Sequence, residues 1–193
     1  KCMKKIWKIK KDEFVVLYFG YLTWYKGVDF LIKSLKNIPS LNGKRIRLII
    51  AGGPSFTQKD KAHYQNFLND VENNLNGAKN IILTGFVKEK DIAPVFKASD
   101  LVVFPYRTFM SSSGPLSLAI SHNKPFILSE KLEELTHSLD IKRTIASIQL
   151  DKNKIIFKLT KKSLIKAIAT SIKKKNQKKM ICLSKALNQE RSF

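Results

Sequence analysis

The stretch FVVLYFGYLTWYKGVDFLIKSL, Phe14–Leu35, decides the fold. Its first seven residues, Phe14–Gly20, are apolar at almost every position and rich in β-branched and aromatic side chains, and a glycine ends them. This pattern is typical of a strand buried on both faces of a sheet. Apolar side chains then recur at helical spacing at Val28, Leu31, Ile32, Leu35 and Ile38. The stretch therefore predicts a buried strand, a short loop and an amphipathic helix.

The same unit recurs along the chain. Segments with helical apolar spacing separate further short apolar runs, and this alternation predicts parallel strands joined by helices that cover the sheet. The predicted strands are Phe14–Gly20, Ile46–Gly53, Asn80–Phe86, Asp100–Tyr106 and Lys124–Glu130, with Thr144–Leu150 as a candidate sixth. We therefore predict an α/β, Rossmann-like parallel sheet with helices on both faces. In such sheets, ligands bind beyond the carboxyl ends of the strands.

The length of 193 residues predicts one domain, residues 1–193, with a basic helical tail at about 151–193. Two amphipathic helices are expected in the tail, each with a lysine-rich outer face. Their apolar stripes predict packing on the sheet, and the alternative is a basic helix lying on an anionic membrane. The chain begins at Lys1 without a methionine, which suggests a piece of a longer protein.

The net charge of +21 favours anionic partners such as nucleic acid, anionic lipid or phosphorylated small molecules. The alternative is that the lysines are simply solvated on every helix. The two cysteines lie at opposite ends, and the three histidines are scattered, so we predict neither a disulfide framework nor a metal site. No apolar run is long enough to cross a membrane, and we expect a cytoplasmic location.

The predicted ligand site lies where strands end in glycine or are followed by a cation. Ser111, Ser112, Ser113 and Gly114 follow a predicted strand and open a predicted helix. Free amides at a helix start, serine hydroxyls and a glycine suit a phosphate or diphosphate. The alternative is that a serine merely caps the helix. Other strand ends add Gly20, Lys26, Gly52, Gly53, Gly85 and Arg107.

Four segments in this order resemble the carboxy-terminal half of glycosyltransferase family 4, the group 1 glycosyltransferases of GT-B architecture. They are FVVLYFGYLTWYKGVDFLIKSL, LIIAGGP, NIILTGFVKEKDIAPVFKASDLVVFPY and SSSGPLSLAISHNKPFILSE. The resemblance covers roughly residues 14–130. It implies a domain that binds a nucleoside diphosphate sugar and a second domain that holds the acceptor. It further implies a metal-independent, hexosyltransferase-like enzyme of polysaccharide biosynthesis.

The resemblance assigns roles to individual residues. Gly20 and Lys26 match the first-loop glycine and the lysine that contacts the donor phosphate, and Ser111 to Gly114 match the phosphate-facing loop. Lys124 and Pro125 match the Lys-Pro pair that begins the next strand. Gly85, Phe86 and Val87 match the loop that passes the nucleotide base.

The sequence also departs from the family pattern. Tyr21 replaces the usual first-loop arginine, and Arg107 is a candidate substitute for it. Met110 and Leu118 occupy the positions of two glutamates that normally face the donor sugar and the ribose. The catalytic residues therefore stay unassigned.

The sequence is compatible with three functions. The first is the donor-binding domain of a glycosyltransferase that transfers a sugar to a glycan or lipid-linked acceptor, with no cofactor and no metal, and with the anionic inner membrane face as a partner. The second is a non-catalytic, degenerate nucleotide-binding or interaction module. The third, a nucleic-acid binder, rests on charge alone, and because the basic tail lacks interleaved aromatic residues we expect no specific nucleic acid.

Overall fold

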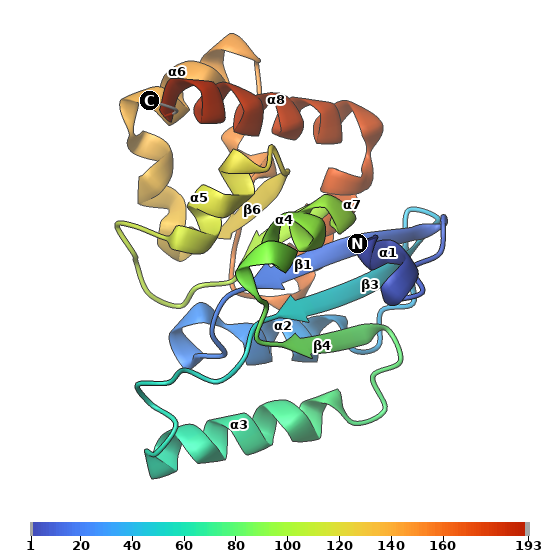
Figure 1. Cartoon of the computed structure of the whole chain (residues 1–193). Coiled ribbons are helices and arrows are strands. Elements are labelled where there is room, and N and C mark those ends of the chain that lie inside the picture. Colours follow the sequence, from blue (N-terminus) through green and yellow to red (C-terminus); the bar gives the residue numbers. More distant parts are fainter. Residues whose placement is uncertain (1, 192–193) are drawn as a thin grey trace.

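The computed structural model describes residues 2–191, in which seven strands form one sheet of the order β2-β3-β1-β5-β6-β7, with β4 also paired to β3 (Figure 1). All pairs are parallel except β2 with β3. The strands are β1 Glu13–Phe19, β2 Ser40–Leu41, β3 Lys44–Ala51, β4 Ile81–Gly85, β5 Leu101–Phe104, β6 Phe126–Ser129 and β7 Ile156–Phe157. The predicted Rossmann-like parallel sheet is confirmed. Residues 1, 192 and 193 of the predicted domain lie outside the described residues.

The central strand is β1, which pairs with β3 along its whole length and with β5 on its other side. Its residues from Glu13 to Tyr18 are buried, as expected of a strand covered on both faces. The chain moves from β1 to β3 and β4 in one direction and then returns past β1 to β5, β6 and β7. The strand order therefore reverses between β1 and β5, and the crevice for a ligand is expected at that point.

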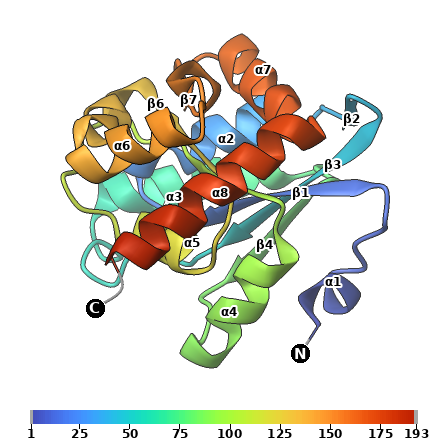
Figure 2. The same ribbon diagram turned by 90° about the horizontal axis from the view of Figure 1, so that it is seen from above.

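Helices cover both faces (Figure 2). Helices α2 and α3 lie side by side on one face, with α7 next to α2, whereas α4 and α5 cover the other face, as right-handed crossovers require. The α-helices are α1 Met3–Ile6, α2 Val28–Leu35, α3 Ala62–Leu75, α4 Glu89–Ala98, α5 Gly114–Ser121, α6 Leu139–Ser147, α7 Lys161–Ile172 and α8 Lys174–Arg191. Within residues 2–191 the 3-10 helices are η1 Trp24–Lys26, η2 Glu130–His137 and η3 Lys152–Lys154.

The tail helices pack on the domain through their apolar stripes. Helix α8 crosses α5 and α6 (Figure 2) and buries Met180, Leu183 and Leu187. The Ser184 hydroxyl donates to the Lys124 carbonyl, with 2.5 Å between the two oxygens. The apolar stripe of α8 is thus buried, as predicted, but against helices and not on the sheet itself, and it is not free to enter a lipid bilayer.

The candidate strand Thr144–Leu150 was wrong. Its first four residues, 144–147, end helix α6, and the last strand is β7, at Ile156–Phe157. Ile141 and Thr144 are buried, and Ile145 and Ile148 pack against the core. This three-and-four spacing prevails over the preference of β-branched residues for strands. The short antiparallel strand β2 and helices α1 and α6 were not predicted.

Among residues 2–191, no helix combines the length and the apolar character that crossing a membrane requires.

Candidate functional site

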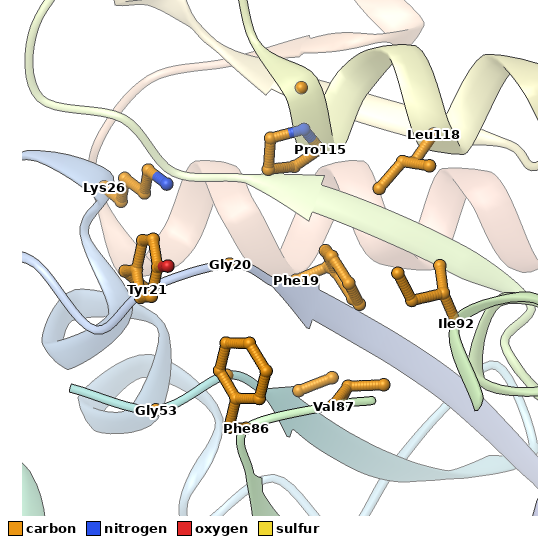
Figure 3. A pocket seen from close by; sticks show the side chains of 13 residues that line it. Phe19, Gly20, Tyr21, Lys26, Gly53, Phe86, Val87, Ile92, Pro115 and Leu118 are labelled. Atoms are coloured by element: carbon orange, nitrogen blue, oxygen red, sulfur yellow. The ribbon is translucent and has the colours of Figure 1, made fainter. Parts of the chain in front are cut away.

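A cavity of about 290 Å³ opens at the carboxyl edge of the sheet, beside the reversal point between β1 and β5 (Figure 3). This volume lies at the lower end of the range of small-molecule sites. The cavity is bounded by the ends of β1, β3 and β4, by α4, and by the first turns of α5. Its lining residues are Phe19, Gly20, Tyr21, Lys26, Ala51, Gly52, Gly53, Phe86, Val87, Ile92, Gly114, Pro115 and Leu118.

Two strand ends meet closely at the floor of the cavity. The Gly20 amide donates to the Ala51 carbonyl at 3.0 Å, and the Leu22 amide donates to the Gly53 carbonyl at 3.0 Å. A Cβ atom on Gly52 would lie 1.8 Å from the Gly20 carbonyl oxygen. Only glycine fits there, so the paired glycines that end the second predicted strand allow the two strand ends to approach.

Lys26 is the charged group of the cavity. Its side chain is only 9% exposed, and within residues 2–191 its ammonium makes no hydrogen bond and no ion pair. The Nζ atom lies 5.8 Å and 5.9 Å from the ring centres of Tyr21 and Tyr25. Burial lowers the pKa of Lys26 below its ordinary value. Lys26 is largely buried and its ammonium faces the cavity without a counter-charge among residues 2–191, which makes it a candidate anion-binding group.

The local fold places Lys26 in this position. The Lys26 amide donates to the Thr23 carbonyl at 3.1 Å, and the Gly27 amide donates to the Trp24 carbonyl at 3.0 Å, which closes the 3-10 turn η1. Gly27 then adopts a φ of 72° and ends this turn just before α2 begins. An ideal Cβ on Gly20 would lie 3.1 Å from the Lys26 Nζ and 3.3 Å from Pro115 Cγ. The cation and the start of α5 therefore flank the end of β1 from the same side (Figure 3).

Three aromatic rings form an exposed rim at the mouth of the cavity. Phe56 lies 6.1 Å from Tyr21 and 5.9 Å from Phe86, measured between ring centres. Phe56 and Phe86 are 63% and 62% exposed. Exposed rings that contact one another beside a cavity suit the face of a planar or apolar ligand group.

The serine–glycine loop differs from the prediction in its details. The Ser113 hydroxyl caps α5 by accepting from the Leu116 amide at 3.4 Å, and it also bonds the Tyr106 hydroxyl at 3.0 Å. Pro115 has no N–H, so in this turn the Gly114 amide is the donor left without a partner within the described chain. Gly114 lines the cavity, whereas the exposed Ser111 and Ser112 do not.

Arg107 lies outside the cavity lining and joins two loops. Its guanidinium forms a bidentate ion pair with the Asp29 carboxylate, with both N–O distances 2.8 Å. It also donates to the Trp24 carbonyl at 2.5 Å. The guanidinium carbon lies 5.0 Å from the centre of the Trp24 ring. The charge of Arg107 is thus already paired in the structure.

The structure brings some of the predicted site residues together and leaves others apart. Of that set, the residues that line the cavity are Gly20, Lys26, Gly52, Gly53, Phe86, Val87 and Gly114. It is not lined by Gly85, Arg107, Ser111, Ser112 or Ser113. Tyr21 and Leu118, noted in the sequence as departures, are lining residues, and Met110 is not. Sequence reasoning missed Phe19, Ala51, Ile92 and Pro115, of which the first three belong to apolar patterns that signal only core packing.

Lys124 does not line the cavity, and its side chain joins two elements of the fold. Its ammonium donates to the Ser99 carbonyl at 2.8 Å and to the Lys97 carbonyl at 3.2 Å, which ties the start of β6 to the end of α4. Burial lowers the pKa of Lys124. Among residues 2–191, no three histidine, cysteine or acidic side chains gather as they would around a metal ion.

Comparison with known proteins gives a consistent result. The family described as "Glycosyl transferases group 1" matches residues 2–134. A GDP-mannose:glycolipid 4-beta-D-mannosyltransferase of Xanthomonas campestris is 30% identical over 112 residues, which are 58% of this chain and 29% of that protein. An uncharacterized glycosyltransferase of Methanocaldococcus jannaschii is 28% identical over 97 residues, which are 50% of this chain and 22% of that protein.

Solved structures show the same fold. HepE from Anabaena, crystallised with UDP and glucose, superposes with a TM-score of 0.72 at 18% identity and covers 98% of this chain and 47% of its own. The C-terminal domain of a group 1 glycosyl transferase from Francisella tularensis superposes with a TM-score of 0.62 at 14% identity, covering 96% of this chain and 87% of its own. The chain thus spans less than a third of its two curated relatives and about half of HepE.

Proposed function

Because the chain belongs to the group 1 glycosyltransferase family, we propose that it is the donor-binding domain of a glycosyltransferase. In this proposal, the cavity at the sheet edge binds a nucleoside diphosphate sugar, and the sugar passes to a glycan or lipid-linked acceptor. The observation that carries the proposal is Lys26, a largely buried residue whose ammonium lies at the cavity wall without a counter-charge among residues 2–191. Two relatives support the ligand class, since HepE was crystallised with UDP and the Xanthomonas enzyme is named for GDP-mannose.

The diphosphate would lie between Lys26 and the first residue of α5. The Lys26 ammonium and the unpartnered Gly114 amide are the two donors that flank this end of the cavity. Both are held by the fold before any ligand arrives, so they need no rearrangement when charge develops on the departing diphosphate. The proposed contribution of these residues is therefore electrostatic stabilisation of the leaving group. The contributions of Ser111, Ser112 and Ser113 stay predictions.

The experiment that tests this is calorimetric titration of the 193-residue chain with UDP, GDP, ADP and the matching monophosphates. We expect one diphosphate to bind at least about tenfold more tightly than its monophosphate, a difference of about 1.4 kcal/mol. Lys26→Met should abolish most of that difference, since it removes the charge and keeps a long apolar stem. Lys33→Met, on the exposed side of α2, is the control and should leave it unchanged. If Lys26→Met and Lys33→Met bind the diphosphate with equal affinity, the proposal is refuted.

One observation favours a second function. Among the lining residues there is no carboxylate, amide or histidine side chain that could position a donor sugar. A degenerate module that holds a nucleotide without transferring sugar would have such a cavity. A longer protein containing this chain, assayed for donor hydrolysis and sugar transfer across a panel of nucleotide sugars, separates the two functions. Binding without turnover would favour the module.

We also propose that the tail contacts an anionic membrane surface, which would place the protein at the inner face of the membrane. Between Asp151 and Glu190 the chain carries twelve lysines and no acidic residue. The apolar stripes of α7 and α8 are buried, so the contact would be electrostatic, with each lysine near the surface contributing about 1 kcal/mol.

Co-sedimentation with vesicles tests the membrane contact. Binding should rise with the phosphatidylglycerol content of phosphatidylcholine vesicles and fall with added salt. Replacing Lys174, Lys175 and Lys178 with glutamine should reduce binding several-fold. The matched control replaces Lys88, Lys90 and Lys97, which are equally exposed near α4. Equal losses from both triple variants would mean that the contact is a property of net charge and not of the tail.

A further inference from the structure

The cavity has an unusual chemical asymmetry. Of its thirteen lining residues, only Lys26 and Tyr21 carry a polar atom in their side chains. An ammonium donates hydrogen bonds and cannot accept them, so the Tyr21 hydroxyl is the one side-chain acceptor of the lining. The Tyr21 ring lies beside the Lys26 ammonium, at the cationic end (Figure 3). The other end offers apolar side chains alone.

The apolar end is formed by two helices and two strand ends. Leu118 lies one helical turn beyond Pro115 on α5, and Ile92 of α4 faces it across the cavity (Figure 3). Phe19 and Val87 complete the wall. Two backbone carbonyls of lining residues are already engaged, because Ala51 accepts from the Gly20 amide and Gly53 from the Leu22 amide.

The position of the cation orients a nucleoside diphosphate. With the diphosphate beside Lys26 and Gly114, the pentose that is bonded to it would lie along Pro115 and Leu118, the next lining residues of α5. The 2′-hydroxyl of a ribose would leave water and find no side-chain acceptor there. A site built to bond a hydroxyl strongly rejects the analogue that lacks it, whereas an apolar wall gives no such selection.

We infer that this cavity does not select ribose and that it accepts 2′-deoxynucleoside diphosphates, free or as sugar donors, at least as well as ribonucleoside diphosphates. The inference rests on the proposed donor-binding function and names the substrate class that the site admits. Leu118 and its apolar neighbours are the residues that set this specificity.

The test compares matched pairs that differ in one oxygen atom. The chain is titrated by calorimetry with UDP and 2′-deoxy-UDP, and with GDP and 2′-deoxy-GDP. We expect the dissociation constants within the binding pair to agree within about threefold or to favour the deoxy form. A preference for the ribose form of about tenfold or more, which is about 1.4 kcal/mol, would overturn the inference and leave the proposed function intact. Failure of all four to bind would instead remove the proposed function.

A second arm tests the placement of the pentose on Leu118. Leu118→Gln introduces an acceptor at the apolar wall and should shift the preference towards ribose by about fivefold. Leu118→Met keeps the wall apolar and should leave the ratio unchanged. Urea unfolding of both variants checks that they are folded. A ratio that Leu118→Gln does not move would overturn the assignment of Leu118 as a specificity residue.

Discussion

Two loops at the same edge of the sheet were predicted to hold phosphate, and they differ in how many hydrogen bonds fix them to the rest of the fold. The first, residues 20–27 between β1 and α2, is tied at several points to its surroundings. The Tyr64 hydroxyl donates to the Leu22 carbonyl at 2.6 Å, the Tyr18 hydroxyl donates to the Tyr21 carbonyl at 2.7 Å, and the Arg107 amide donates to the Tyr25 carbonyl at 2.7 Å. These hydrogen bonds fix the loop with the Lys26 side chain at the cavity.

The second loop, residues 108–113 between β5 and α5, has the more suggestive sequence and fewer bonds. Within the described chain, residues 108–112 make no hydrogen bond, and Ser113 bonds only Tyr106 and its own helix. The serines and the glycine of the second loop therefore indicate where a phosphate could bind. Holding a charged side chain in a largely buried position requires a loop with many fixed contacts, such as the first loop. The comparison makes the first loop the preformed part of the site.

The largest effect is expected at Gly27, which fixes the end of the first loop. A Cβ there would lie 1.9 Å from the Pro105 carbonyl oxygen, at a φ of 72°. Gly27→Ala should lower the free energy of unfolding by about 3–5 kcal/mol in urea titrations, through strain and a backbone clash.

Gly43→Ala is the matched control for Gly27. Gly43 has a φ of 74°, and nothing lies within 4 Å of its ideal Cβ, so the control measures the conformational cost alone. It should cost about 1–2 kcal/mol. Equal losses at both sites would mean that the contact with Pro105 does not fix the first loop.

The next largest effect is expected on loss of Arg107, which joins the chain after β5 to Trp24 in the first loop and to Asp29 in α2. Arg107→Ala leaves Asp29 without its partner and should cost about 2–3 kcal/mol of stability in the same urea assay. Asp29→Ala should cost a similar amount, and the double variant should cost little more. The affinity of the folded variants for a diphosphate should change less than about threefold. A loss of affinity without a loss of stability would make Arg107 a phosphate ligand, as the sequence suggested.

The sequence predicted most strands correctly, and the cavity lies at the strand ends where the sequence predicted a ligand site, for a physical reason. Strand β1 and helix α2 are recognisable because buried strands and amphipathic helices impose short-range apolar periods. The burial of Lys26 was not predictable, because it depends on a 3-10 turn and on a contact between strand ends far apart in sequence. The pairing of Arg107 with Asp29 joins residues 78 positions apart, and no local pattern reveals it. The pattern around Ile92 indicated only a core residue, because an apolar cavity wall and an apolar core have the same spacing.

A pH titration sharpens the comparison further, because only the first loop carries a buried cation. Burial lowers the pKa of Lys26, and a bound diphosphate would favour the charged form. Affinity for the diphosphate should therefore fall as the pH rises through the lowered pKa, approaching the roughly tenfold loss expected of Lys26→Met. The free energy of unfolding should instead rise with pH. Between the folded and the unfolded pKa of Lys26, the unfolded chain holds one more proton than the folded chain.

Calorimetry from about pH 7.5, above the phosphate titration, to about pH 10.4, the ordinary pKa of lysine, measures this effect. The Lys26→Met variant is the control, and its affinity should be independent of pH. A wild-type affinity that stays flat over this range would show that the Lys26 charge does not contact the ligand.

The smallest effect is expected in the second loop. Ser113→Ala removes the cap of α5 and should cost about 1 kcal/mol of stability, while exposed Ser112→Ala should cost less than about 0.5 kcal/mol. Neither should change the affinity for a diphosphate more than about twofold, because the donors at the cavity wall are Lys26 and Gly114. If Ser113→Ala instead loses about tenfold in affinity, the hydroxyl must leave its cap and Tyr106 to reach the ligand. The second loop would then be the part of the site that rearranges on binding, and the first loop only its fixed support.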